Sequence, residues 1–115
     1  MHRLPCPCCG FLTLEHAYGS YVVCPICAWE DDGVQLANPT SAGGANERSL
    51  AEAQARVIER YPLDIDAVRG FRRDVRWRPL SDAEIAAAEQ RRVVDYWHSL
   101  GACDLADAYW LKTST

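Results

Sequence analysis

The cysteines constrain this chain more than any other feature. Five of its six cysteines fall between residues 6 and 27, in the segments CPCCG and CPICA. Both segments have the form Cys-Pro-X-Cys, in which proline presets φ at the first bend. The glycine that ends the first segment permits a positive φ and a close backbone approach. Each segment therefore predicts a tight turn, called here the first knuckle (residues 6–10) and the second knuckle (residues 24–28).

Two such knuckles predict a metal site. Fourteen residues separate Cys9 from Cys24, an interval that suits a β-hairpin able to bring the knuckles together. Four thiolates would then surround one ion in a tetrahedral array, about 2.3 Å from it. Because four cysteine ligands leave no open position for water, we expect one structural Zn²⁺. The predicted ligands are Cys6, Cys9, Cys24 and Cys27.

The cysteines could also bind iron or form disulfides. Rubredoxin-like iron sites also use paired knuckles, but a longer and more aromatic segment usually separates them. Disulfides are disfavoured because the N-terminus lacks the apolar stretch of a signal peptide, and thiols stay reduced in the cytoplasm. Cys8 could replace Cys6 or Cys9 as a ligand, although a small side chain at the variable knuckle position is the simpler interpretation. Cys103 stands alone and is expected to be a buried small hydrophobic residue.

Length and charge bound the class of protein. The chain has 115 residues, so one domain is the default. No apolar run approaches the ~18 residues of a membrane span, so we expect a cytoplasmic protein without a membrane partner. The net charge is −4, which implies no general affinity for nucleic acid. However, residues 69–78 carry five arginines and one aspartate, and this segment is called the basic island.

The region around the knuckles is predicted to form a β-hairpin followed by a loop. Residues 11–15 and 20–24 are short runs rich in β-formers, and Gly19 between them suits a turn. Residues 36–46 (LANPTSAGGAN) have the composition of a loop, which we interpret as structural.

Helices are predicted behind this loop. Ser49 and Glu52 have capping-box spacing, apolar residues follow with helical periodicity, and Pro62 ends the helix. A short helix is expected over residues 65–75, although Gly70 is unfavourable there.

The last part of the chain repeats the capping-box signal. Ser81 and Glu84 predict a long helix to about Leu100, and Asp104 could cap a last short helix through Leu111. The expected fold class is α+β: a small N-terminal zinc-ribbon β-hairpin module packed with three or four C-terminal helices. We expect a single domain over residues 1–115, with the hairpin in 1–35, the loop in 36–46 and the helical part in 47–115.

Three segments carry a resemblance. CPCCGFLTLE, GSYVVCPICAWEDDGVQ and NPTSAGGANERSLAEA resemble the bacterial cysteine-rich CPCC family, over about residues 4–55. The resemblance implies a small zinc-ribbon-like domain and says little about activity. A small acidic protein of this kind is also similar, in a general way, to immunity proteins that neutralise bacterial toxins.

Two further groups of residues are candidate contact sites. Trp29 and the acidic triplet that follows it (Glu30, Asp31 and Asp32) could bind a basic protein partner; alternatively, Asp31 or Asp32 bonds backbone N–H groups in a turn. The arginines of the basic island could contact nucleic acid, or could lie on a solvated helix face paired with acidic neighbours. These arginines are Arg69, Arg72, Arg73, Arg76 and Arg78.

The sequence offers no catalytic set with interpretable spacing. Its three histidines, His2, His16 and His98, form no recognisable group with a nucleophile. We therefore expect a non-enzymatic zinc-binding protein that recognises another protein, in particular an immunity or antitoxin protein that neutralises a basic toxin. The alternative is a nucleic-acid-associated regulator that uses the basic island, and the third is a rubredoxin-like iron electron carrier.

Overall fold

The computed structural model of the chain describes residues 3–95 and 109–111, without the side chains of residues 92–95. It is a small α+β structure with two separate two-stranded antiparallel sheets. The elements in chain order are β1 (Leu4–Pro5), β2 (Leu12–Leu14), α1 (Gly33–Ala37), α2 (Leu50–Arg60), β3 (Ala67–Val68), β4 (Phe71–Arg72), α3 (Asp82–Asp95) and the 3-10 turn η2 (Tyr109–Leu111).

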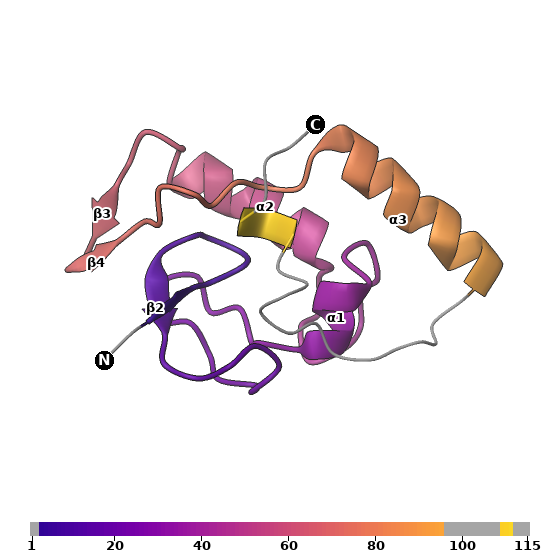
Figure 1. Cartoon of the computed structure of the whole chain (residues 1–115), viewed down its shortest axis with the longest axis horizontal. Coiled ribbons are helices and arrows are strands. Elements are labelled where there is room, and N and C mark those ends of the chain that lie inside the picture. Colours follow the sequence, from indigo (N-terminus) through magenta and orange to yellow (C-terminus); the bar gives the residue numbers. More distant parts are fainter. Residues whose placement is uncertain (1–2, 96–108, 112–115) are drawn as a thin grey trace.

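The molecule is elongated, with principal extents of 42 × 26 × 25 Å. In Figure 1 the β3–β4 hairpin projects at one end of the long axis and α3 lies at the other. The N-terminal segment with α1 occupies the lower part of that view, and η2 lies between these regions. None of the described helices is long and apolar enough to cross a membrane.

The predicted hairpin between residues 11–15 and 20–24 is wrong. Strand β2 pairs instead with β1, with Leu4 opposite Leu14 and Pro5 opposite Leu12. Val23 forms a bridge with Glu30. Each β pairing therefore closes its own knuckle, because a knuckle joins its two flanks through a very short loop and pairing across it costs little chain entropy.

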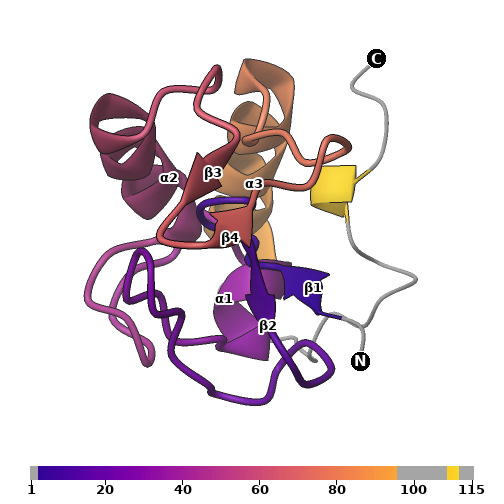
Figure 2. The same ribbon diagram turned by 90° about the vertical axis from the view of Figure 1, so that its left-hand side faces the viewer.

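The short helix predicted over residues 65–75 is also wrong. The segment forms the β3–β4 hairpin, in which Val68 lies opposite Phe71. Arg69 and Gly70 in its turn both have positive φ, 49° and 86°. Two consecutive positive φ values are typical of the tight turns that suit the twist of a hairpin. Gly70 supplies one of them without strain, and Figure 2 shows the hairpin beside β2.

The two predicted capping boxes are confirmed. Ser49 Oγ accepts from Glu52 N at 3.2 Å, and a Glu52 carboxylate oxygen accepts from Ser49 N at 2.9 Å, at the start of α2. Ser81 and Glu84 make the same reciprocal pair at the start of α3.

The elements outside these boxes differ more from prediction. Helix α1 was not predicted, and it begins just before the expected loop of residues 36–46. The predicted end of the long helix at Leu100 and the cap at Asp104 lie outside the described residues. At the end predicted for the last short helix, Tyr109–Leu111 form the 3-10 turn η2.

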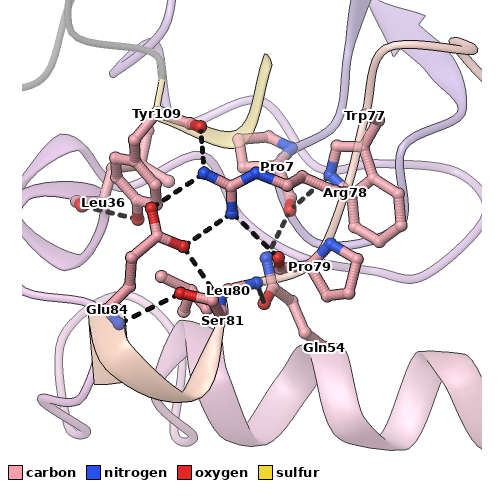
Figure 3. Close-up of polar contacts among 10 residues, drawn as sticks. All are labelled: Pro7, Leu36, Gln54, Trp77, Arg78, Pro79, Leu80, Ser81, Glu84 and Tyr109. Carbon is pink, nitrogen blue, oxygen red and sulfur yellow. Dashed lines mark hydrogen bonds and ion pairs between the residues drawn. The ribbon is translucent and has the colours of Figure 1, made fainter. Parts of the chain in front are cut away.

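A polar clamp joins the C-terminal segments to the N-terminal part (Figure 3). Arg78 donates to both carboxylate oxygens of Glu84, at 2.6 and 2.8 Å, and to the carbonyl of Tyr109 at 3.0 Å. The Tyr109 hydroxyl donates in turn to the Leu36 carbonyl at 2.9 Å. Trp110 beside it is fully buried and packs edge-on against Tyr18. The start of α3, η2 and α1 are thereby held together.

Candidate metal centre

The two knuckles have the same backbone geometry. In the first, Gly10 N donates to Cys6 O at 2.7 Å; in the second, Ala28 N donates to Cys24 O at 2.9 Å. The last residue of each knuckle has positive φ, +83° at Gly10 and +66° at Ala28. The alanine thus adopts a conformation that glycine adopts without strain.

This geometry brings the four predicted ligand sulfurs together. Each lies within 4.8 Å of the other three, and they belong to Cys6, Cys9, Cys24 and Cys27, called here the four-cysteine cluster. Two Sγ–Sγ distances between the knuckles are 3.7 Å, from Cys6 to Cys27, and 3.8 Å, from Cys9 to Cys24. Sulfurs in a tetrahedron at about 2.3 Å from an ion lie about 3.8 Å apart. A disulfide needs about 2.05 Å, and these cysteines are free thiols. The donor set and its spacing therefore fit a tetrahedral metal ion.

Burial and mutual hydrogen bonds shift the pKa values of the cluster thiols in opposite directions. Burial, followed by a hydrogen bond with Cys24, raises the pKa of the Cys6 thiol well above its ordinary value. Hydrogen bonds from the Cys24 and Cys6 thiols lower the pKa of Cys27. A bound cation would displace the thiol protons and stabilise all four thiolates.

The pattern around this centre also matches a known family model, described as cysteine-rich CPCC, over residues 4–61. The chain belongs to the cysteine-rich CPCC family. The match includes both knuckles, the acidic triplet, the loop and α2. No curated protein matches the chain.

Cys8, the additional cysteine of the CPCC segment, is buried but is not a member of the four-cysteine cluster. Its place at the variable position of the first knuckle agrees with a small side chain that packs in the interior. His16 is exposed and does not belong to the four-cysteine cluster. The predictions for His2, His98 and Cys103 fall outside the described residues.

Polar groups from β2 and from the second knuckle support one sulfur of the cluster. Thr13 Oγ1 lies 3.1 Å from Cys24 Sγ, and Ile26 N donates to the same sulfur at 3.4 Å. A hydroxyl and an amide N–H that face one sulfur stabilise its thiolate form. Such bonds suit a sulfur that carries negative charge toward a metal.

The first knuckle is covered by side chains from distant parts of the chain, and one of them, Trp77, lies beyond the family match. The Pro7 carbonyl accepts from Gln54 Nε2 at 2.9 Å and from Trp77 Nε1 at 3.0 Å. The Trp77 ring lies against Gly10 so closely that a Cβ on this glycine would be 2.5 Å from a ring carbon. Glycine at the end of the first knuckle is therefore required both by its positive φ and by the packing of Trp77.

The acidic triplet does not form an exposed patch, which corrects the partner-binding interpretation of Asp31 and Asp32. Asp31 is fully buried and accepts from Gly19 N and Ser20 N. Asp32 is 5% exposed, caps α1 and also accepts from Ala45 N at 2.9 Å. Asp32 and the Oδ2 atom of Asp31 accept from backbone N–H groups, as the alternative interpretation expected for one of them, whereas the buried Asp31 Oδ1 has no partner among the described residues. Glu30 is half-buried and Trp29 is buried.

A buried glutamine of α1, Gln35, ties this helix to the loop and to Arg48 just after it. Gln35 Nε2 donates to the carbonyls of Ser41, Asn46 and Arg48, at 3.1 to 3.2 Å. Its Oε1 accepts from the Asn46 backbone and side chain. Asn46 also exchanges two hydrogen bonds with the backbone of Glu30. The sequence reasoning missed Gln35, although its place in the WEDDGVQ motif was visible.

The basic island is largely occupied by internal contacts. Arg73 is buried; its guanidinium donates to the carbonyls of Cys9, Tyr61, Pro62 and Ile65 and lies 4.4 Å from the centre of the Phe11 ring. Arg76 pairs with Asp74, and Arg78 belongs to the clamp. Arg69 donates to the Pro25 carbonyl, and Arg72 is exposed on β4. The predicted helix face does not exist, because these arginines lie on a hairpin and an extended segment.

Proposed function

We propose that this CPCC-family chain is a non-enzymatic zinc-binding protein whose surface recognises another protein. The observation that carries the metal part is the tetrahedral spacing of the four-cysteine cluster. Four cysteine ligands would complete the coordination of one Zn²⁺ and leave no position for a substrate or water. The ion would therefore act as a structural link between the two knuckles.

Iron remains the alternative for the same four sulfurs, and it is distinguished by colour. The protein is expressed in medium that contains both metals, purified without chelators and subjected to elemental analysis and visible spectroscopy. We expect about one zinc per chain and a colourless protein. A red protein with stoichiometric iron would favour the rubredoxin-like electron carrier, and less than half an equivalent of any metal would contradict the metal proposal.

The charge and the exposed surface support a protein partner. The chain has a net charge of −4, and its described acidic side chains at the surface lie mainly outside the triplet. Exposed apolar side chains occur beside the second knuckle, where Tyr21 is 54% and Val23 is 56% exposed. Acidic groups around an apolar contact favour a basic partner and speed its association. The most specific form of this proposal is an immunity or antitoxin protein for a basic toxin.

The nucleic-acid-associated regulator is less well supported, because Arg73 and Arg78 make internal contacts. The partner proposal is tested with a basic toxin encoded beside this chain, by measuring association at low and high salt. Reversal of the exposed carboxylates Asp64 and Asp66 should slow association, and salt should reduce the difference. Binding of DNA or RNA at physiological salt that is lost on Arg72→Glu would favour the regulator instead.

A further inference from the structure

A cavity of about 320 Å³ lies between the second knuckle, the loop and α2. The second knuckle contributes Ile26 and Cys27. Asn46 at the end of the loop and the two residues after it also line the cavity, and α2 contributes its face from Ala53 to Arg60. This volume is at the lower end of the range for small-molecule sites in proteins.

The bottom and the rim of the cavity differ in chemistry. Of its lining residues, Ile26, Trp29 and Val57 are buried and supply an apolar bottom. Arg48, Arg56 and Arg60 are exposed and lie at the rim. A ligand that fills the cavity would therefore place an apolar group inward and a charged group outward.

The rim carries an excess of positive charge. It has three arginines and one acidic side chain, Glu47. Arg56 and Arg60 are four residues apart on α2, where like charges destabilise a helix. Among the side chains of residues 3–91 and 109–111, the ion pairs are made by Arg3, Arg76 and Arg78, so the rim arginines have no carboxylate partner there. An anion between the guanidinium groups would relieve this repulsion.

One of the buried residues that line the cavity, Trp29, has a donor without a partner. Trp29 is 3% exposed, and its Nε1 has no hydrogen-bond partner among the described residues. The indole N–H can only donate, and a buried donor without an acceptor is costly. Trp29 lines the cavity, so a bound molecule would lie beside this buried ring, and its indole N–H signal would report on binding.

We propose that this cavity binds a small organic anion, a carboxylate or phosphate monoester attached to an apolar group. The apolar group packs on Ile26, Trp29 and Val57, and the anionic group lies between Arg56 and Arg60. This site goes beyond the proposed function, because it depends neither on the identity of the metal nor on a protein partner.

The site is tested on the full-length, metal-loaded protein by NMR titration with phenyl phosphate and with phenylacetate. We expect a saturable shift of the Trp29 indole N–H signal with at least one of the two anions. The Trp77 indole N–H, which donates to Pro7 O, is the internal control and should not move. Inorganic phosphate and benzyl alcohol, which carry only the charge or only the apolar group, should bind at least about tenfold more weakly.

Matched variants assign the contacts. Arg56→Gln and Arg60→Gln should each weaken binding about tenfold, whereas Arg72→Gln on β4 should leave it unchanged. Ala53→Leu should block the cavity while it keeps every charge. The proposal is overturned if neither anion gives saturable binding, if Arg72→Gln weakens binding as much as the rim variants, or if Ala53→Leu binds like the parent protein. It is also overturned if the rim variants lose metal and keep anion affinity, because the arginines would then serve the charge of the metal centre.

Discussion

At the scale of single residues, the five N-terminal cysteines have unequal roles. Four sulfurs lie within 4.8 Å of one another, while Cys8 is buried outside this cluster. A thiol that ligates a metal cannot be replaced by a hydroxyl without loss of affinity. A buried thiol that only donates a hydrogen bond, as Cys8 does to Cys27, can be replaced by a hydroxyl that also donates. The difference between these two kinds of cysteine is measurable.

We expect serine at Cys9 or Cys24 to abolish stoichiometric metal binding and to unfold the N-terminal part. Structural zinc contributes roughly 10–16 kcal/mol of apparent free energy in small zinc-binding peptides. Serine at Cys8 should retain the metal and cost about 1 kcal/mol or less. Elemental analysis and thermal unfolding of the three variants provide the measurement. A Cys8→Ser protein without metal would show that the ligand set is misassigned.

The equivalent last positions of the knuckles predict opposite responses to matched changes. Ala28 has φ +66°, so Ala28→Gly should remove backbone strain and stabilise the protein by about 0.5–1 kcal/mol. Gly10→Ala should destabilise it strongly, because the added Cβ would lie 2.5 Å from the Trp77 ring. Chemical denaturation of both variants with metal bound compares the two knuckles. Equal effects at the two positions would contradict this account.

Acid should release the metal. Burial raises the pKa of the Cys6 thiol, so its proton competes effectively with a metal ion. Ligand thiols must lose their protons on binding, so metal affinity rises with pH and falls as pH decreases. Metal content after equilibration across a pH series checks this direction. Retention that is independent of pH down to the unfolding transition would oppose it.

At the scale of elements, short-range capping and long-range ties contribute differently. The capping box of α2 involves residues only three apart. By contrast, Gln35 on α1 donates to the carbonyls of Ser41, Asn46 and Arg48, which lie 6 to 13 positions away. Gly44 in that loop has no room for a side chain, since a Cβ there would lie 2.7 Å from an Asp32 oxygen. Helix α1 is only five residues long, so these contacts stabilise it more than its own backbone bonds do.

Replacement of Gln35 by leucine should release the loop. The change leaves three carbonyls and the Asn46 backbone N–H without their partner and should cost about 3 kcal/mol. Hydrogen exchange should accelerate over residues 38–48 before it changes in α2. Asn38→Ala is the control, because its side chain donates one hydrogen bond, to Val34 O, and its loss should cost about 1 kcal/mol. Similar exchange in both variants would show that Gln35 is not the main tie.

At the scale of the whole molecule, the C-terminal half completes the N-terminal module. Gln54, Arg73 and Trp77 donate to carbonyls of the first knuckle across 47 to 70 positions of sequence. The clamp of Arg78, Glu84 and Tyr109 fastens η2 to the start of α3 and to Leu36 on α1 (Figure 3). Arg73 and Trp77 therefore help to hold the knuckle that provides two of the four sulfurs.

Loss of the Trp77 side chain should weaken the metal centre from a distance. Trp77→Ala removes a buried ring that covers Gly10 and should cost about 3–5 kcal/mol. Metal transfer to a coloured chelator should become faster, because the first knuckle opens more often. Val75→Ala is the control, since Val75 is 98% exposed. Unchanged transfer rates in a clearly destabilised Trp77→Ala protein would separate the C-terminal half from the metal centre.

The sequence by itself determined the local features. Cys-Pro-X-Cys specifies a knuckle within five residues, and Ser49 with Glu52 specifies a helix start within four, so the cysteine grouping and both capping boxes were predictable. Only the tertiary structure decided the strand pairings, the burial of Asp31 and Asp32, and the place of Arg73 among four carbonyls. From a sequence, a charged side chain is expected to be exposed, because burying a charge costs free energy. For these side chains, backbone groups from other parts of the chain offset that cost. The Cys9 carbonyl, 64 residues from Arg73, is one of these groups, and no local pattern could indicate it.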